Sequence, residues 1–182
     1  MEKFIIASDI HGSAYWCEKL LQVMREENAK LILLGDLLYH GPRNPFPDGY
    51  DPQKVFTMLN AEKENILCVR GNCDSEVDQM VLEFPIRADY AQVYVNAHTL
   101  FLTHGHLFNK EILPPLKKGD LLLNGHFHTP ANEILENGVH YLNCGSVALP
   151  KEGTPHSYIL YDHGTFYFKD LETDGIFDCL SL

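Results

Sequence analysis

The chain has 182 residues, of which 45% are hydrophobic and 21% are charged, so it can bury one core and is too short for two large domains. Twenty-five acidic and fourteen basic residues give a formal net charge of −11, which argues against a protein that grips duplex nucleic acid. We therefore expect residues 1–182 to form one domain that is complete from its first residue.

The five cysteines contain no Cys-x-x-Cys pair, which argues against a disulfide framework or a thiolate zinc site and favours a reducing compartment. No apolar run approaches the roughly 18 residues of a membrane span, and the N-terminus lacks the layout of a signal peptide. We therefore expect a cytoplasmic protein with no membrane partner. Homo-oligomer formation stays open.

The first half of the chain repeats a strand followed by a helix. Apolar runs predict buried strands at residues 4–7, 31–34 and 66–69. Helices are predicted after Ser13, a typical N-cap, after the pair Asp51-Pro52, and as a short amphipathic segment within residues 74–82. This order of elements predicts a parallel sheet with right-handed crossovers.

The second half of the chain holds short strands that follow one another closely. They are predicted at residues 92–95, 99–103, 121–124, 139–142, 157–161 and 165–169. The first two flank residues 96–98 like a hairpin. Together the two halves predict an α/β fold: a two-sheet sandwich of mixed parallel and antiparallel strands, flanked by helices.

Residues that can bind metals follow five of the apolar runs. They are Asp9 and His11, then Asp36, Asn72, His104 with His106, and His126 with His128. Because the carboxyl ends of parallel strands meet at one edge of a sheet, we expect these side chains to converge. Glycines precede three of them directly, as is typical where backbones pack closely; these are Gly35, Gly71 and Gly125. Other histidines are expected at the surface, namely His98, His140, His156 and His163.

Seven of these residues are too many for one tetrahedral zinc ion and fit two metals that share a bridging carboxylate. The predicted ligands are Asp9, His11, Asp36, Asn72, His104, His126 and His128. Asp36 is the natural bridge. Nitrogen and oxygen donors favour borderline divalent ions, with Mn²⁺ as the first expectation and Fe²⁺, Co²⁺, Ni²⁺ or Zn²⁺ as alternatives. Such a pair can hold a bridging hydroxide and clamp two phosphoryl oxygens, so an acidic chain can still take an anionic substrate.

The order of these segments resembles that of the calcineurin-like metallophosphoesterase superfamily. The segments are Asp9-Ile10-His11, Gly35-Asp36, Gly71-Asn72-Cys73-Asp74, Thr103-His104-Gly105-His106 and Gly125-His126-Phe127-His128. Residues 40–45 and 72–79 further resemble the small YfcE-type bacterial phosphodiesterases. The resemblance covers essentially the whole chain and implies a single metallophosphoesterase domain over residues 1–182.

The resemblance also implies how the ligands are shared. One metal falls to Asp9, His11, Asp36 and His128, and the other to Asp36, Asn72, His104 and His126. Most family members place a histidine after the asparagine ligand, where it helps with the leaving group or the transition-state charge, whereas this chain has Cys73. A thiol with a pKa of about 8.5 replaces such an imidazole poorly, so Cys73 is either a small filler or a weak catalyst, and His106 is the alternative proton donor. The expected catalytic residues are Asn72, Cys73, His104 and His106.

Residues 39–51 form a segment with three prolines that is too long and irregular for an ordinary connection. Because it follows Asp36 closely, we expect it to stand over the metals as a specificity wall. Arg43 would meet a phosphate oxygen there, and Cys73 is the other expected substrate contact. A rigid surface loop or an oligomer contact is the alternative.

These expectations combine into a dinuclear metal-dependent phosphodiesterase, in which hydroxide attacks phosphorus in line and small diesters with acidic, aryl-type leaving groups react best. A phosphomonoesterase on the same site is one alternative. A non-catalytic scaffold of the Vps29 type is another, which the complete set of seven ligands disfavours. A structural zinc site is disfavoured because such sites are usually rich in thiolates.

Overall fold

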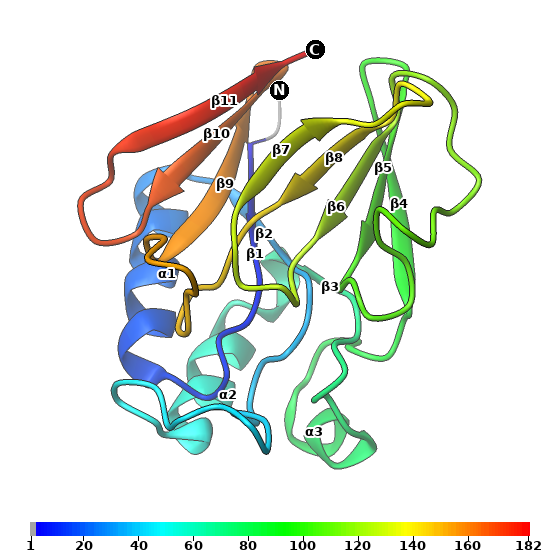
Figure 1. Cartoon of the computed structure of the whole chain (residues 1–182). Helices are drawn as coiled ribbons and strands as arrows, with labels where there is room; N and C mark the ends of the chain where they lie inside the picture. The colour runs from blue at the N-terminus through cyan, green and yellow to red at the C-terminus, as the bar shows by residue number, and fades with distance from the viewer. Residues whose placement is uncertain (1–2) are drawn as a thin grey trace.

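The computed structural model describes residues 3–182, and Figure 1 shows how their helices and strands are arranged. The strands are β1 (Phe4–Ala7), β2 (Lys30–Leu33), β3 (Ile66–Cys68), β4 (Tyr90–Val95), β5 (His98–Thr103), β6 (Leu121–Asn124), β7 (Ala131–Ile134), β8 (His140–Asn143), β9 (Ser157–Asp162), β10 (Thr165–Asp170) and β11 (Ile176–Ser181). The helices are α1 (Ala14–Glu26), α2 (Pro52–Ala61), the short 3-10 helix η1 (Lys63–Asn65) and α3 (Glu76–Val81).

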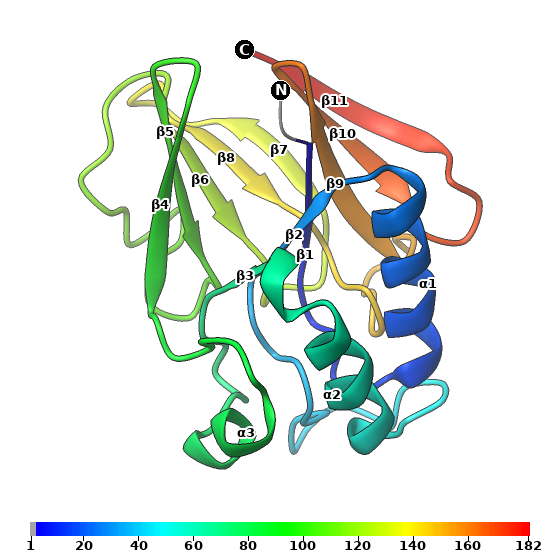
Figure 2. The same ribbon diagram turned by 180° about the vertical axis from the view of Figure 1, so that it is seen from behind.

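The strands form two mixed sheets, as the sequence predicts. The six-stranded sheet has the order β11-β10-β9-β1-β2-β3, in which β1, β2 and β3 are parallel and β9 pairs antiparallel with β1. The five-stranded sheet has the order β4-β5-β6-β8-β7, in which β5, β6 and β8 are parallel. Helices α1 and α2 lie against the six-stranded sheet, as the view from behind shows (Figure 2).

Strand β1 shows why the core has layers. Successive side chains of a strand point to opposite faces of the sheet, so Ile5 and Ala7 pack with the apolar residues of α1 and α2, while Ile6 packs with residues of the five-stranded sheet. All three are fully buried. A third, smaller cluster around Phe101 and Tyr141 lies on the other face of the five-stranded sheet. The continuous apolar run at the N-terminus is therefore the central strand between two hydrophobic layers.

The predicted helix starts are confirmed. The Ser13 hydroxyl accepts a hydrogen bond from the Trp16 N–H (3.2 Å), and α1 then buries its apolar face. The Asp51 carboxylate accepts from the Lys54 N–H (3.0 Å), with Pro52 at the first helical position of α2. A side-chain oxygen at the cap satisfies an N–H group that has no partner within the helix.

Other expectations were wrong in detail. Helix α3 buries none of its six residues, so it is not an amphipathic helix packed on the core. The edge strands β7 and β11 were missed because they are largely exposed and lack a continuous apolar run. His156 is not a free surface residue, because its ring stacks on Trp16 with centroids 3.6 Å apart. Within residues 3–182, no helix has the length and apolar character needed to span a membrane.

Candidate metal centre

The seven predicted ligands follow the ends of five strands from both sheets. Asp9 and His11 come after β1, Asp36 after β2, Asn72 after β3, His104 after β5, and His126 and His128 after β6. The structure brings all seven together in two neighbouring groups of donor atoms, so the expected convergence is observed.

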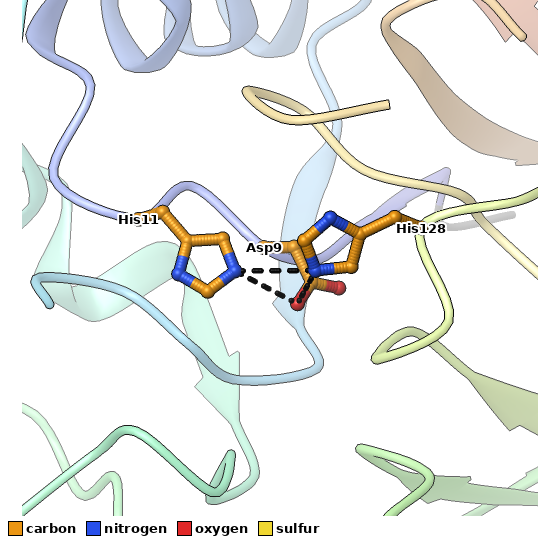
Figure 3. A group of neighbouring side chains, drawn as sticks. All are labelled: Asp9, His11 and His128. Carbon is orange, nitrogen blue, oxygen red and sulfur yellow. Dashed lines mark hydrogen bonds and ion pairs between the residues drawn. The ribbon is translucent and has the colours of Figure 1, made fainter. Parts of the chain in front are cut away.

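The first group consists of Asp9, His11 and His128 (Figure 3). The Asp9 Oδ1 atom lies 3.3 Å from His11 Nε2 and 3.2 Å from His128 Nε2, and the two imidazole nitrogens are 3.3 Å apart. Donor atoms that share an ion at bond lengths near 2.1 Å stand about 3.0–3.4 Å from one another. Asp9 Oδ1 is buried and has no hydrogen-bond partner among the described residues. The group therefore fits a bound cation.

The second group surrounds His104. Its Nε2 atom lies 3.4 Å from Asp36 Oδ2, 3.2 Å from Asn72 Oδ1 and 3.2 Å from His126 Nδ1. The same Asp36 Oδ2 is 3.8 Å from Nε2 of His11 in the first group. Asp36 thus stands between the two groups, as a bridging carboxylate would.

Backbone carbonyls hold three of the imidazoles in a fixed orientation. The Nδ1 atoms of His11, His104 and His128 bond to the carbonyl oxygens of Tyr39 (2.8 Å), Leu34 (2.7 Å) and Leu149 (2.6 Å), respectively. A carbonyl only accepts, so each Nδ1 carries a proton, and in the neutral ring each Nε2 presents its lone pair to the centre. His126 is different, because its Nδ1 atom faces His104.

Unusual backbone conformations place most of these ligands. The φ angles are positive at Asp9 (61°), His11 (49°), Asp36 (56°), His126 (65°) and His128 (63°). Side chains other than glycine rarely adopt this left-handed region, which costs of order 1–3 kcal/mol per residue and is concentrated at functional sites. The folded chain therefore maintains this strain at the candidate metal ligands.

Glycines allow the backbones at the ends of neighbouring strands to approach one another closely. A Cβ atom on Gly71 would collide with the backbone N and the carboxylate of Asp36, and one on Gly125 would collide with the side chains of Ser8 and Asp9. The expected close packing beside the ligands is thus confirmed at both positions.

Asp74 is a buried carboxylate whose role the sequence did not reveal. Its Oδ2 atom accepts hydrogen bonds from the backbone N–H groups of Asp36 (2.9 Å) and Gly71 (2.7 Å), and its Oδ1 atom accepts from Leu37 (2.9 Å). Burial raises the pKa of Asp74 although these donors oppose the shift. Asp74 thus ties together the turns that carry Asp36 and Asn72.

The charges of the centre balance one another. Burial would raise the pKa of Asp9, but the neighbouring His104, His11 and His128 outweigh it and hold that pKa well below its usual value. Burial would lower the pKa of His104, but Asp9 and Asp36 outweigh it and raise that pKa to about 9. Burial and His104 together lower the pKa of His126 to about 4. Without metal, protonated imidazole thus supplies the positive charge that neutralises the carboxylates. A bound cation would replace that charge.

A cavity of about 370 Å³ opens onto this centre. Its lining includes His11, Asp36, Asn72, His126, His128, residues 41–44 and Cys73, so both predicted substrate contacts, Arg43 and Cys73, border the same space as the ligands. Lys151, which the sequence pattern did not single out, lines it too. A larger hollow of about 580 Å³ lies beside the C-terminal end of α1, and none of the candidate metal-binding groups found within residues 3–182 borders it.

The two candidate proton donors differ in their surroundings. The Cys73 N–H donates to Asp36 Oδ1 (2.8 Å), and burial and the Asp36 charge raise the pKa of the Cys73 thiol. The thiol is thus a weaker acid than an ordinary cysteine. His106 is half-buried, its ring lies 5.5 Å from that of His104, and burial and His104 lower its pKa. It does not line the cavity described above.

The comparisons with known proteins agree with this arrangement. Residues 2–165 match the family model described as "Calcineurin-like phosphoesterase superfamily domain". The chain is 49% identical over 164 residues to Phosphodiesterase YfcE of Escherichia coli (strain K12), covering 90% of this chain and 89% of that protein. The solved structure of the E. coli phosphoesterase YfcE superposes with a TM-score of 0.95 at 45% identity, covering 98% of both chains.

More distant structures share the fold alone. A predicted phosphoesterase from Streptococcus pneumoniae TIGR4 is 20% identical with a TM-score of 0.62, covering 100% of this chain and 98% of that chain. Vps29 of Chaetomium thermophilum is 13% identical with a TM-score of 0.65, covering 100% of this chain and 97% of that chain. With the family model and the 49% identical relative, these findings lead to one conclusion: the chain belongs to the calcineurin-like phosphoesterase superfamily.

Proposed function

We propose that this protein is a dinuclear metal-dependent phosphodiesterase that hydrolyses small phosphodiesters. The observation that carries the proposal is the position of Asp36 Oδ2, which lies 3.8 Å from His11 Nε2 and 3.4 Å from His104 Nε2 and so joins two groups of donors. The relative at 49% identity is a phosphodiesterase, which supports the same reaction here.

Each metal has a proposed set of ligands. Asp9, His11, Asp36 and His128 would hold one ion, and Asp36, Asn72, His104 and His126 the other. Divalent cations supply Lewis acidity there: they lower the pKa of water and neutralise phosphoryl charge. The donors are nitrogen and oxygen atoms, for which we propose Mn²⁺, with Fe²⁺, Co²⁺, Ni²⁺ or Zn²⁺ as alternatives.

In the hydrolysis, a water oxygen forms a bond to phosphorus while the bond from phosphorus to the leaving oxygen breaks, and a proton ends on the leaving oxygen. The chain positions this reaction: Arg43 lies on the cavity, where its guanidinium can hold a phosphoryl oxygen in two hydrogen bonds. In this proposal, residues 39–51 form the side of the cavity that carries Arg43. The preorganised ligands, three of them fixed by backbone carbonyls, need no rearrangement during the reaction.

The leaving group decides how much proton transfer matters. The raised pKa of Cys73 makes the thiol a poor proton donor, and His106 lies outside the cavity lining, so we infer weak general-acid help. Substrates whose leaving groups depart as stable anions, such as aryl phosphodiesters, should therefore react best. A phosphomonoesterase is the second candidate because the same centre can bind a monoester.

The test is metal-dependent hydrolysis. Protein dialysed against a chelator should lose the hydrolysis of bis(4-nitrophenyl) phosphate and regain it with Mn²⁺, and it should cleave 4-nitrophenyl phosphate more slowly. Full hydrolysis by protein that is free of metal by elemental analysis would refute the mechanism. Faster cleavage of the monoester would favour a phosphomonoesterase, and metal binding without any hydrolysis would favour a scaffold.

A further inference from the structure

The cavity over the metal centre contains two basic residues from separate parts of the chain, Arg43 and Lys151. No ion pair is formed by either side chain within residues 3–182. This sets Arg43 apart from the three other arginines, each of which pairs with a carboxylate: Arg25 with Glu62, Arg70 with Asp89 and Arg87 with Glu76. In a chain with 25 acidic residues, two cations that border a cavity and pair with no carboxylate among residues 3–182 are available for an anionic ligand.

Both residues belong to ordered segments, from which their exposed side chains border the cavity. Arg43 belongs to residues 39–51, where the rings of His40, Phe46 and Tyr50 contact one another with centroids 4.4–5.3 Å apart. The Asn44 side chain also donates to the His40 carbonyl (2.9 Å). These internal contacts order the segment, although most of its residues are exposed.

Lys151 belongs to a strap that we define as residues 146–151. The Ser146 hydroxyl donates to the Asp9 carbonyl (3.0 Å) and accepts from the Leu149 N–H (2.9 Å). Near its end, the Leu149 carbonyl bonds to His128 Nδ1 (2.6 Å) and the Lys151 N–H donates to the His128 carbonyl (3.1 Å). The strap thus hydrogen-bonds to both the ring and the backbone of the candidate metal ligand His128, and it places Lys151 at the cavity.

The charge of the centre indicates what these cations bind. Two divalent ions with the carboxylates of Asp9 and Asp36 leave two positive charges, which a hydroxide nucleophile and a singly charged phosphodiester neutralise. Arg43 and Lys151 then add two further positive charges. Even with Arg43 hydrogen-bonded to a phosphoryl oxygen, an ordinary diester would leave these two charges uncompensated, whereas a substrate with additional negative charge would balance them.

We propose that Arg43 and Lys151 form a subsite for a second anionic group, so that the substrate is a phosphodiester that also carries a carboxylate or a phosphate. This inference rests on the proposed diesterase function. It adds Lys151 as a specificity-determining residue and narrows the substrate class from small phosphodiesters to polyanionic ones.

The kinetic test uses two matched phosphodiester probes, 4-nitrophenyl 4-carboxyphenyl phosphate and the analogue in which an uncharged carbamoyl group replaces the carboxylate. Both release nitrophenolate and differ by one charge. The wild type should prefer the carboxylate probe by about tenfold or more in kcat/KM, because charge-assisted hydrogen bonds are strong in a partly closed cavity. This preference should fall towards one in Lys151→Met and in Arg43→Met, and it should persist in Lys151→Arg. The control is Lys117→Met, which changes an exposed lysine outside the cavity and should keep the preference.

A binding measurement separates the subsite from catalysis. Metal-free protein should bind inorganic pyrophosphate in calorimetric titrations, and Lys151→Met and Arg43→Met should each weaken this binding about tenfold, unlike Lys117→Met. If the metal-loaded wild type hydrolysed neither probe, the proposed function would be refuted. Normal hydrolysis with equal kcat/KM for the two probes, or a preference unchanged in both cavity variants, would refute only the subsite.

Discussion

Replacing Asp74 by asparagine tests how the centre is held together. The carboxylate accepts three backbone hydrogen bonds, two at Oδ2 from Asp36 and Gly71 and one at Oδ1 from Leu37. An asparagine has a single accepting oxygen, and it can keep at most the pair at Oδ2. Its NH₂ group would then face the Leu37 N–H, so that a buried donor loses its acceptor.

The cost follows from this geometry. A hydrogen bond to a charged group is worth about 1.5–3 kcal/mol and a buried donor without a partner costs about 1–3 kcal/mol, while removing the buried charge returns part of this. We expect Asp74→Asn to lower the free energy of unfolding by about 2 kcal/mol. Because the same bonds hold the turn of Asp36, metal affinity should fall about 10–100-fold, as for other residues that orient ligands.

The assay combines urea unfolding of the metal-free protein with calorimetric titration of Mn²⁺. Asp78→Asn is the matched control, since Asp78 also accepts backbone and hydroxyl hydrogen bonds, from Ser75, but caps the exposed helix α3. It should change stability by less than about 1 kcal/mol and leave metal affinity unaltered. Equal effects of the two variants, or an Asp74 variant with native metal affinity, would refute the positioning role.

Three further predictions concern the centre itself. Asp36→Asn should reduce the content of both metals, whereas His11→Ala should mainly empty one site; elemental analysis showing full occupancy in Asp36→Asn would rule out the bridge. In metal-free protein, the pKa of His104, raised from its usual 6.5 to about 9, adds stability that is complete below pH 6.5 and is lost as the pH rises through 9. Metal binding between these pH values should thus release protons, and titration heats that do not vary with the ionisation enthalpy of the buffer would contradict this. Cys73→His should accelerate alkyl diesters more than aryl ones, by up to about 10²–10⁴-fold if geometry permits, unless His106 already protonates the leaving group. A small gain together with a costly His106→Ala would show that it does, and rates independent of leaving-group pKa in the wild type would refute the reasoning.

The sequence predicted the features that depend on short patterns. Buried apolar runs located the central strands, Ser13 and Asp51 marked the helix starts, and polar residues at strand ends marked the side chains that converge at the candidate centre. These signals are local, and the rule that parallel strands end at one edge turns them into a site. The family resemblance added the division of the ligands between two metals, which remains a proposal.

Features that depend on contacts between residues far apart in the sequence could not be predicted from short patterns. Asp74 resembles any polar residue near a helix start, and only the fold shows that its partners are Asp36, Leu37 and Gly71. Lys151 has no pattern of its own, since the strap that positions it is defined by bonds to Asp9 and His128. The positive φ angles of the ligands likewise arise from tertiary constraint, because aspartate and histidine do not prescribe them.

The pairing of β1 with β9 has a consequence for how the protein is made. Ile5 pairs with Leu160, 155 positions later, so the central strand can pair with β2 early but lacks its antiparallel neighbour β9 until most of the chain has left the ribosome. Closing so long a loop is entropically costly and makes folding slow. All seven candidate ligands, which end at His128, are translated before β9 exists. We therefore expect the nascent chain to expose its donors before the sheet can fix them, and the native centre to mature only after synthesis is nearly complete.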